Sequence, residues 1–146
     1  MEKLLFDNGV KEYKLGGGSV LRFNPGDPNL YARFLEAAER ISQIEDEMIH
    51  SSKTENCDDM GAAILKLLQE ADQKMKQTLN WVFGQENDFD KILGGVNLLA
   101  VGANGKRVVS NLFDALQPIL LAGAQNCAKE KTQEAVKQAK ARRSKQ

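Results

Sequence analysis

The sequence is poor in the side chains that most catalytic and metal sites need. It holds one histidine, His50, and two cysteines, Cys57 and Cys127, which lie 70 positions apart. A zinc site needs several such ligands at short spacing, and a cysteine nucleophile needs a nearby base. We therefore expect His50 to be an exposed residue near a helix end and the cysteines to be incidental thiols. No catalytic, metal or cofactor site is expected.

Long apolar runs and an excess of charge of one sign are also missing. No run approaches the length of a membrane span, and the apolar run at the start is too short for a signal peptide. The 20 Lys and Arg residues balance the 20 Asp and Glu residues. A protein that binds nucleic acid through its whole surface would usually be basic. These absences predict a cytoplasmic protein with no membrane contact, and they disfavour nucleic acid as a partner.

The first part of the chain has the pattern of a small β-sheet. Asn8-Gly9 is a strong signal for a two-residue hairpin turn, because both central positions of a type I′ turn need positive φ. Centring the turn there places Leu4 opposite Tyr13 on one apolar face. Gly16–Ser19 then interrupts the strand, and residues 20–23 resume it. The sequence predicts a three-stranded antiparallel meander within residues 2–24.

Helical patterns follow from residue 28 onward. Asp27 and Pro28 suit the N-cap and first position of a helix over residues 28–49. Residues 51–56 have no apolar period and predict a loop. A second long helix is expected from about Asp58 and Asp59 to its stop at Gly84, and a short one over residues 88–93 with Asp88 as its cap.

A final helix is expected to begin near Lys106 and to be kinked or split at Pro118. The apolar stripes of the long helices predict a core that includes Phe34, Ile41, Ile64, Leu68, Leu112 and Leu116. The expected fold is α+β, with the small antiparallel meander packed on a bundle of about four helices.

The neutral total charge hides an asymmetry along the chain. Residues 1–126 carry 13 Lys and Arg against 18 Asp and Glu, a net of −5, whereas residues 127–146 carry 7 against 2, a net of +5. We expect one globular domain over residues 1–126 and a basic helix end or tail over residues 127–146. The tail is either a solvated helix end or a site for an acidic partner, with Lys137, Lys140, Arg142 and Arg143 as candidate contacts.

Trp81 and Phe83 flank Val82 at the expected end of the second long helix. Three consecutive large apolar side chains cannot all face one core from a single helical stripe. The rings either pack on the short helix, against Phe89 and Leu93, or contact a partner protein, since aromatic residues are enriched at interface centres. Trp81 and Phe83 are therefore further candidate partner-binding residues.

The order of several short phrases resembles a known family. Residues 12–15 (EYKL) and 20–25 (VLRFNP) lead into an acidic amphipathic helix, residues 87–95 read NDFDKILGG, and a Pro-containing final helix ends in Lys and Arg. This order resembles small tail-gene proteins of phages and prophages of Gram-positive bacteria, of the tail assembly chaperone type. The resemblance extends from about Glu12 to the basic tail.

The resemblance implies a non-enzymatic helper that acts in the bacterial host cytoplasm. It would bind the tape measure protein, with tail tube subunits as a second candidate partner, and cover apolar helical surface until the tube replaces it. Whether the chain is a homo-oligomer is left open by the sequence. The alternative is a nucleic-acid-associated phage or plasmid accessory protein that acts through the basic tail, although no aromatic residue follows Phe113 to stack on bases.

Overall fold

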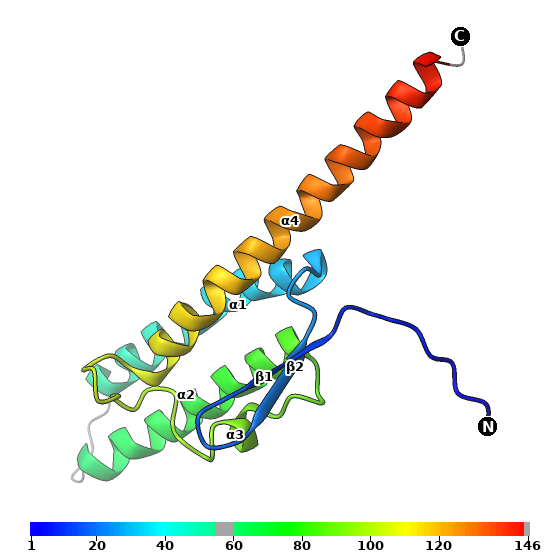
Figure 1. Ribbon diagram of the computed structural model, residues 1–146. Helices are drawn as coiled ribbons and strands as arrows, with labels where there is room; N and C mark the ends of the chain where they lie inside the picture. The colour runs from blue at the N-terminus through cyan, green and yellow to red at the C-terminus, as the bar shows by residue number, and fades with distance from the viewer. Residues whose placement is uncertain (55–59, 145–146) are drawn as a thin grey trace.

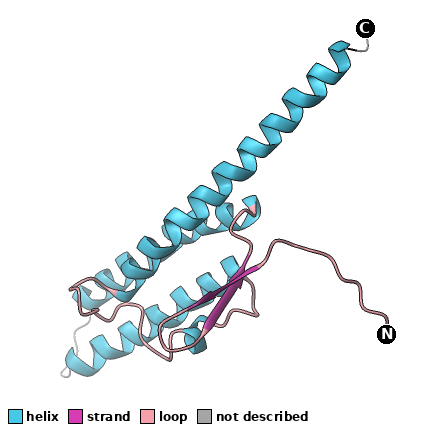
Figure 2. Ribbon diagram, viewed as in Figure 1, coloured by secondary structure: helices cyan, strands magenta, loops and turns pink. Residues whose placement is uncertain are grey.

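The computed structural model describes residues 1–54 and 60–144. Within these residues, the strands β1 (Lys11–Lys14) and β2 (Val20–Phe23) are followed by the helices α1 (Pro28–Thr54), α2 (Met60–Phe83), α3 (Phe89–Ile92) and α4 (Val108–Ser144). The helices supply most of the structure, and the sheet lies beside α2 and α3 (Figure 1, Figure 2). The α+β class expected from the sequence is confirmed.

The two strands form an antiparallel hairpin in which Tyr13 lies opposite Leu21. Its turn is closed by two backbone hydrogen bonds, one from the Leu15 amide to the Ser19 carbonyl and one from the Gly18 amide to the Leu15 carbonyl. Gly18 has a φ of 92°, which a residue with a Cβ rarely adopts. The glycine-rich segment is therefore a hairpin loop.

The expected third strand is not formed. The sheet of the described chain has two strands, and residues 1–10 belong to none. A type I′ turn needs positive φ at both central residues, and Gly9 has it whereas Asn8 does not. The Asn24 amide donates instead to the Asn8 carbonyl oxygen (2.9 Å). The Val10 amide, which would close the predicted turn onto Asp7, donates to the Asn8 side chain (3.1 Å). The prediction of a strand before Asn8 was wrong because these two contacts of Asn8 replace the bonds of the closed turn.

The first helix starts where its caps predict. The Asp27 side chain accepts a hydrogen bond from the Asn29 amide (2.9 Å), and Pro28 is the first helical residue. The helix runs further than its apolar stripe, as far as Thr54, so the predicted loop was wrong for residues 51–54. The Ser52 hydroxyl donates to the Ile49 carbonyl, a local bond compatible with continued helix.

Local stop signals end α2 and define α3. Gly84 has a φ of 100° and follows the last residue of α2, and Asp88 caps α3 by accepting from the Asp90 amide. Both were predicted. The expected start of the second helix at Asp58 and Asp59, and the thiol of Cys57, lie outside the described residues.

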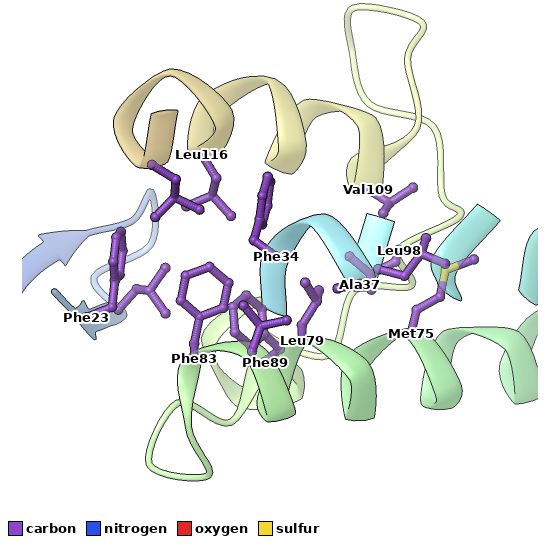
Figure 3. Packing of buried hydrophobic residues seen from close by; sticks show 14 of the residues in the cluster. Phe23, Phe34, Ala37, Met75, Leu79, Phe83, Phe89, Leu98, Val109 and Leu116 are labelled. Atoms are coloured by element: carbon purple, nitrogen blue, oxygen red, sulfur yellow. The ribbon is translucent and has the colours of Figure 1, made fainter. Parts of the chain in front are cut away.

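The core lies between α1, α2, the first half of α4 and the inner face of the hairpin (Figure 3). Phe34, Ile41 and Leu116 are buried there, as the apolar stripes predict. Ile64 is 40% exposed, so its prediction as a core residue was wrong. It lies in the first turns of α2, whereas the buried residues of that helix begin at Ala71. Leu68 and Leu112 pack at the edge of the core, half-buried.

The last helix is continuous through Pro118, so the expected split does not occur. Proline removes one helical hydrogen bond and its ring crowds the preceding turn. Pro118 is exposed, and the buried side chains Leu116 and Leu120 anchor the helix on both sides of it. The boundary expected after residue 126 therefore falls inside one helix.

Gly123 lets α4 approach the turn that precedes α1. A Cβ at this position would overlap the carbonyl group of Pro25, which is backbone and cannot rotate away. The close approach of α4 to this turn therefore depends on the absence of a side chain at position 123.

Gly123→Ala is expected to lower the free energy of unfolding by about 1–3 kcal/mol through this overlap. In an unhindered helix the same change would raise it by about 0.5–1 kcal/mol. Urea unfolding measures the sign. Ala122→Gly, at the exposed neighbouring position, is the control for helix propensity alone, and a stabilised Gly123→Ala protein would contradict the close contact.

Candidate functional site

The second half of α4 extends away from the rest of the molecule (Figure 1). Every residue from 128 to 143 is exposed. We call this segment the C-terminal arm; at 1.5 Å per residue its 16 residues extend about 24 Å. An isolated helix of this length is marginal in water, since most helical stability in proteins comes from packing. The arm is therefore an element with helical geometry and an exposed surface.

The arm carries six basic side chains and two acidic ones, Glu130 and Glu134. Its ion pair is internal and weak, from Lys131 to Glu134 at 4.0 Å. Arg142 and Arg143 lie in the last turn, where cations interact favourably with the helix dipole. The arm does not fold back onto the acidic body (Figure 2). The described basic residues are Lys129, Lys131, Lys137, Lys140, Arg142 and Arg143.

Trp81 lies on the surface where α2 faces α1. Its side chain is 37% exposed, and the Arg40 guanidinium lies 4.3 Å from the ring centroid. Arg40 is itself held by Glu36, with 2.8 Å between nitrogen and oxygen. Arg40 thus packs over one face of the indole, and the exposed part of Trp81 is accessible to solvent or to a partner.

Phe83 does not belong to that surface. It is buried, and its ring lies 5.1 Å from the ring of Phe23 and 5.4 Å from that of Phe89, as measured between centroids. The structure shows core packing of Phe83 against Phe89, which is one of the two alternatives that the sequence left open (Figure 3). As a partner-binding candidate Phe83 was wrong, because the hairpin covers it.

A buried ionic cluster, which was not predicted from the sequence, surrounds Lys76. The Lys76 ammonium contacts Asp72 at 2.8 Å and Asp90 at 2.7 Å. Asp72 also accepts a hydrogen bond from the Leu98 amide (2.8 Å), which ties the loop before α4 to α2. Lys76 and Asp72 are buried, whereas Asp90 is largely exposed. The i,i+4 spacing of Asp72 and Lys76 was visible in the sequence, but nothing in it indicated burial.

The electrostatics of this cluster favour a structural role. Burial lowers the pKa of Lys76, but the hydrogen bonds and charges of Asp72 and Asp90 outweigh it, so its pKa is raised above 10.5. A lysine that acts as a base or nucleophile needs a lowered pKa. Lys76 is therefore a fixed cation that joins α2 to α3.

A groove of about 710 Å³ lies between the segment around Asn8, strand β2 and the end of α2. Two of the polar side chains that line it bind backbone carbonyl groups. The Arg33 Nε donates to the Val82 carbonyl, and the Asn87 amide donates to the Arg22 and Phe83 carbonyls. Among the described residues that line it there is no Ser, Thr, Tyr, Lys, Cys or His side chain. Among its described residues the groove therefore offers no hydroxyl, thiol, amine or imidazole nucleophile, and the carboxylates that line it are Glu86 and Asp27, which caps α1.

The remaining residues that the sequence singled out lie on different helices. His50 is an exposed residue of α1, and Cys127 is a half-buried free thiol on α4. Across residues 1–54 and 60–144, no three His, Cys, Asp or Glu side chains gather closely enough to hold a metal ion. In the same part of the chain, no helix combines the length and apolar content needed to cross a membrane.

Of the partner-binding candidates that the sequence singled out, the basic residues of the C-terminal arm and Trp81 thus lie at the surface. Comparison with known proteins adds no relative: no family model, curated protein or solved structure matches the chain.

Proposed function

We propose that this chain is a non-enzymatic, protein-binding helper of phage tail morphogenesis, a tail assembly chaperone that acts in the host cytoplasm. Its expected partner is the tape measure protein, with tail tube subunits as the second candidate. The proposal joins the family resemblance of the sequence to one structural observation. That observation is a helical arm whose every described side chain from residue 128 to 143 is exposed.

The arm offers a surface for binding and contributes little to the stability of the fold. It contributes no buried side chain, so its helical form gains little from tertiary packing. A partner helix laid along it would supply the missing contacts. Its alanines leave room for close approach, and its basic residues fit an acidic stretch of the partner. The arm would thus cover part of a long helical protein before assembly is complete.

Truncation after Asn126 tests the role of the arm. We expect the truncated protein to keep its fold, because the removed residues make few contacts and exposed ion pairs contribute only about 0–1 kcal/mol each. Its association with a purified tape measure protein should be slower. The wild-type association rate should fall as salt rises from about 50 to about 300 mM, because the screening length shortens, while the truncated rate stays nearly flat.

Stopped-flow or surface-based kinetics measure both rates, and circular dichroism checks the fold. Trp81→Ala is a separate variant that retains the arm. If Trp81 lies at the interface, it should speed dissociation and leave the salt dependence of association unchanged. Equal association rates for wild-type and truncated protein at low salt would contradict steering by the arm, and no binding to either candidate partner would contradict the proposed function.

The cationic arm also favours a second candidate, binding to nucleic acid. Its six described basic side chains could neutralise phosphates. In that case the whole protein would retain duplex or single-stranded DNA in a strongly salt-dependent manner, and truncation after Asn126 would abolish retention. A filter-binding assay at several salt concentrations distinguishes the two functions.

A further inference from the structure

The outer edge of β2 is covered by a side chain. The Asn87 amide oxygen accepts a hydrogen bond from the Arg22 N–H (3.0 Å), and its amide nitrogen donates to the Arg22 carbonyl (2.7 Å). Asn87 thus satisfies both backbone groups of Arg22, as a neighbouring strand would. Because these groups point away from β1, Arg22 and the opposite residue, Glu12, form a pair without mutual backbone hydrogen bonds.

The outer edge of β1 has no such cover. Since Glu12 lies opposite Arg22, its N–H and C=O point away from β2. The sheet of the described chain contains β1 and β2 alone, so no strand pairs with this edge. An uncovered edge strand is a template for pairing with another chain, and proteins usually protect it.

The N-terminal segment carries apolar side chains but belongs to no sheet of the described chain. Leu4, Leu5 and Phe6 are 86%, 87% and 74% exposed, respectively. The segment runs away from the body instead of folding back along β1 (Figure 1). In this position the three consecutive apolar side chains gain none of the stabilisation that burial would give them.

The residues of this segment can pair with those of β1, but the segment does not close onto β1 of the same chain. Centred on Asn8-Gly9, the pairing places Leu4 opposite Tyr13 and Leu5 opposite Glu12. Closing that hairpin in the same chain needs positive φ at Asn8, which it lacks, and release of its carbonyl from the Asn24 amide. An open hinge between complementary strands is the arrangement that leads to strand exchange between copies.

We infer that residues 2–7 of one copy pair with the β1 edge of a second copy, so that the chain forms a dimer by reciprocal exchange of its N-terminal strands. Each added strand pairs antiparallel with β1, as it would in the closed hairpin. Leu4 and Phe6 then lie on the same face as Tyr13, whose ring stacks on that of Phe23 with centroids 4.6 Å apart. The exchange covers both open edges at once and extends each sheet to three strands.

Cross-linking tests the register directly. Leu5 and Glu12 would be paired residues on the outer face, with Cα atoms about 5.5 Å apart, within the range of a disulfide. One variant carries Leu5→Cys and the other Glu12→Cys, both with Cys57→Ser and Cys127→Ser. We expect the mixed variants to form a disulfide-linked heterodimer under mild oxidation, as seen by non-reducing electrophoresis and mass spectrometry.

Sedimentation equilibrium tests the assembly itself. The wild-type protein should be a dimer, and removal of residues 1–7 should give a folded monomer, with the fold checked by circular dichroism. Truncation after Asn126 is the matched control and should leave the dimer intact.

Three results would overturn the inference. They are a monomeric wild-type protein, a dimer that survives removal of residues 1–7, and an intrachain disulfide in a monomer that carries both Leu5→Cys and Glu12→Cys. The last would mean that the segment closes onto its own β1.

Discussion

Replacing Lys76 with Met is expected to lower the free energy of unfolding by about 3–5 kcal/mol, because it leaves a buried carboxylate without its cation. The Asp72 side chain is 13% exposed and would keep only the Leu98 amide as a partner. Asp90 is 65% exposed and loses little, since water can replace the ammonium. Urea or thermal unfolding measures the loss.

Lys74→Met is the matched control for the Lys76 substitution. Lys74 lies on the same helix but is exposed, and its change should stay within about 0.5 kcal/mol. Asp72→Asn combined with Lys76→Met should recover much of the loss, because the amide still accepts from Leu98 and no charge is buried. A Lys76→Met protein as stable as wild type would mean that solvent reaches Asp72.

The same cluster sets a stability change at alkaline pH. The raised pKa of Lys76 means that its contribution is fully present below its ordinary pKa of 10.5 and is lost as pH rises through the higher folded value. The difference in unfolding free energy between wild type and Lys76→Met should therefore be constant between about pH 7 and pH 10 and shrink above that range. A difference that already declines at neutral pH would contradict the raised pKa.

Leu79→Ala is expected to cost about 2–5 kcal/mol, whereas Leu65→Ala should stay within about 0.5 kcal/mol. Both leucines lie on α2, so their helix propensities cancel in the comparison. Leu79 is fully buried between the helices, whereas Leu65 is 64% exposed (Figure 3). The measurement is urea unfolding of each variant against wild type. Equal costs would mean that the core reaches the first turns of α2.

Features set by local chemistry were predictable from the sequence. The start of α1 at Asp27 and Pro28, the end of α2 at Gly84 and the cap of α3 at Asp88 are all where the sequence predicts them. Each depends on a backbone angle or a hydrogen bond within a few residues, so the neighbouring sequence is enough to determine it. The α+β class followed from the same signals.

Some features of the candidate sites were likewise predictable from the sequence, and others depended on tertiary contacts. The surplus of positive charge near the C-terminus is a property of composition, so the sequence determined it. The arm stays exposed because only the first half of α4 packs on the rest of the protein, and this depends on tertiary contacts. The sequence left Trp81 and Phe83 equivalent. In the folded chain Phe23 and Phe89 pack on Phe83 and bury it, whereas Trp81 stays at the surface.

Tertiary structure alone decided the features that depend on residues far apart in the chain. The Asn24 amide donates to the Asn8 carbonyl from 16 positions away, at a place where the sequence predicts a closed turn. Leu98 completes the site of Asp72 from 26 positions away, and Pro25 requires glycine at position 123. The sequence by itself determined where helices start and stop, because those rules act over a few residues. Which apolar and charged side chains are buried depended on contacts that exist only once the chain has folded.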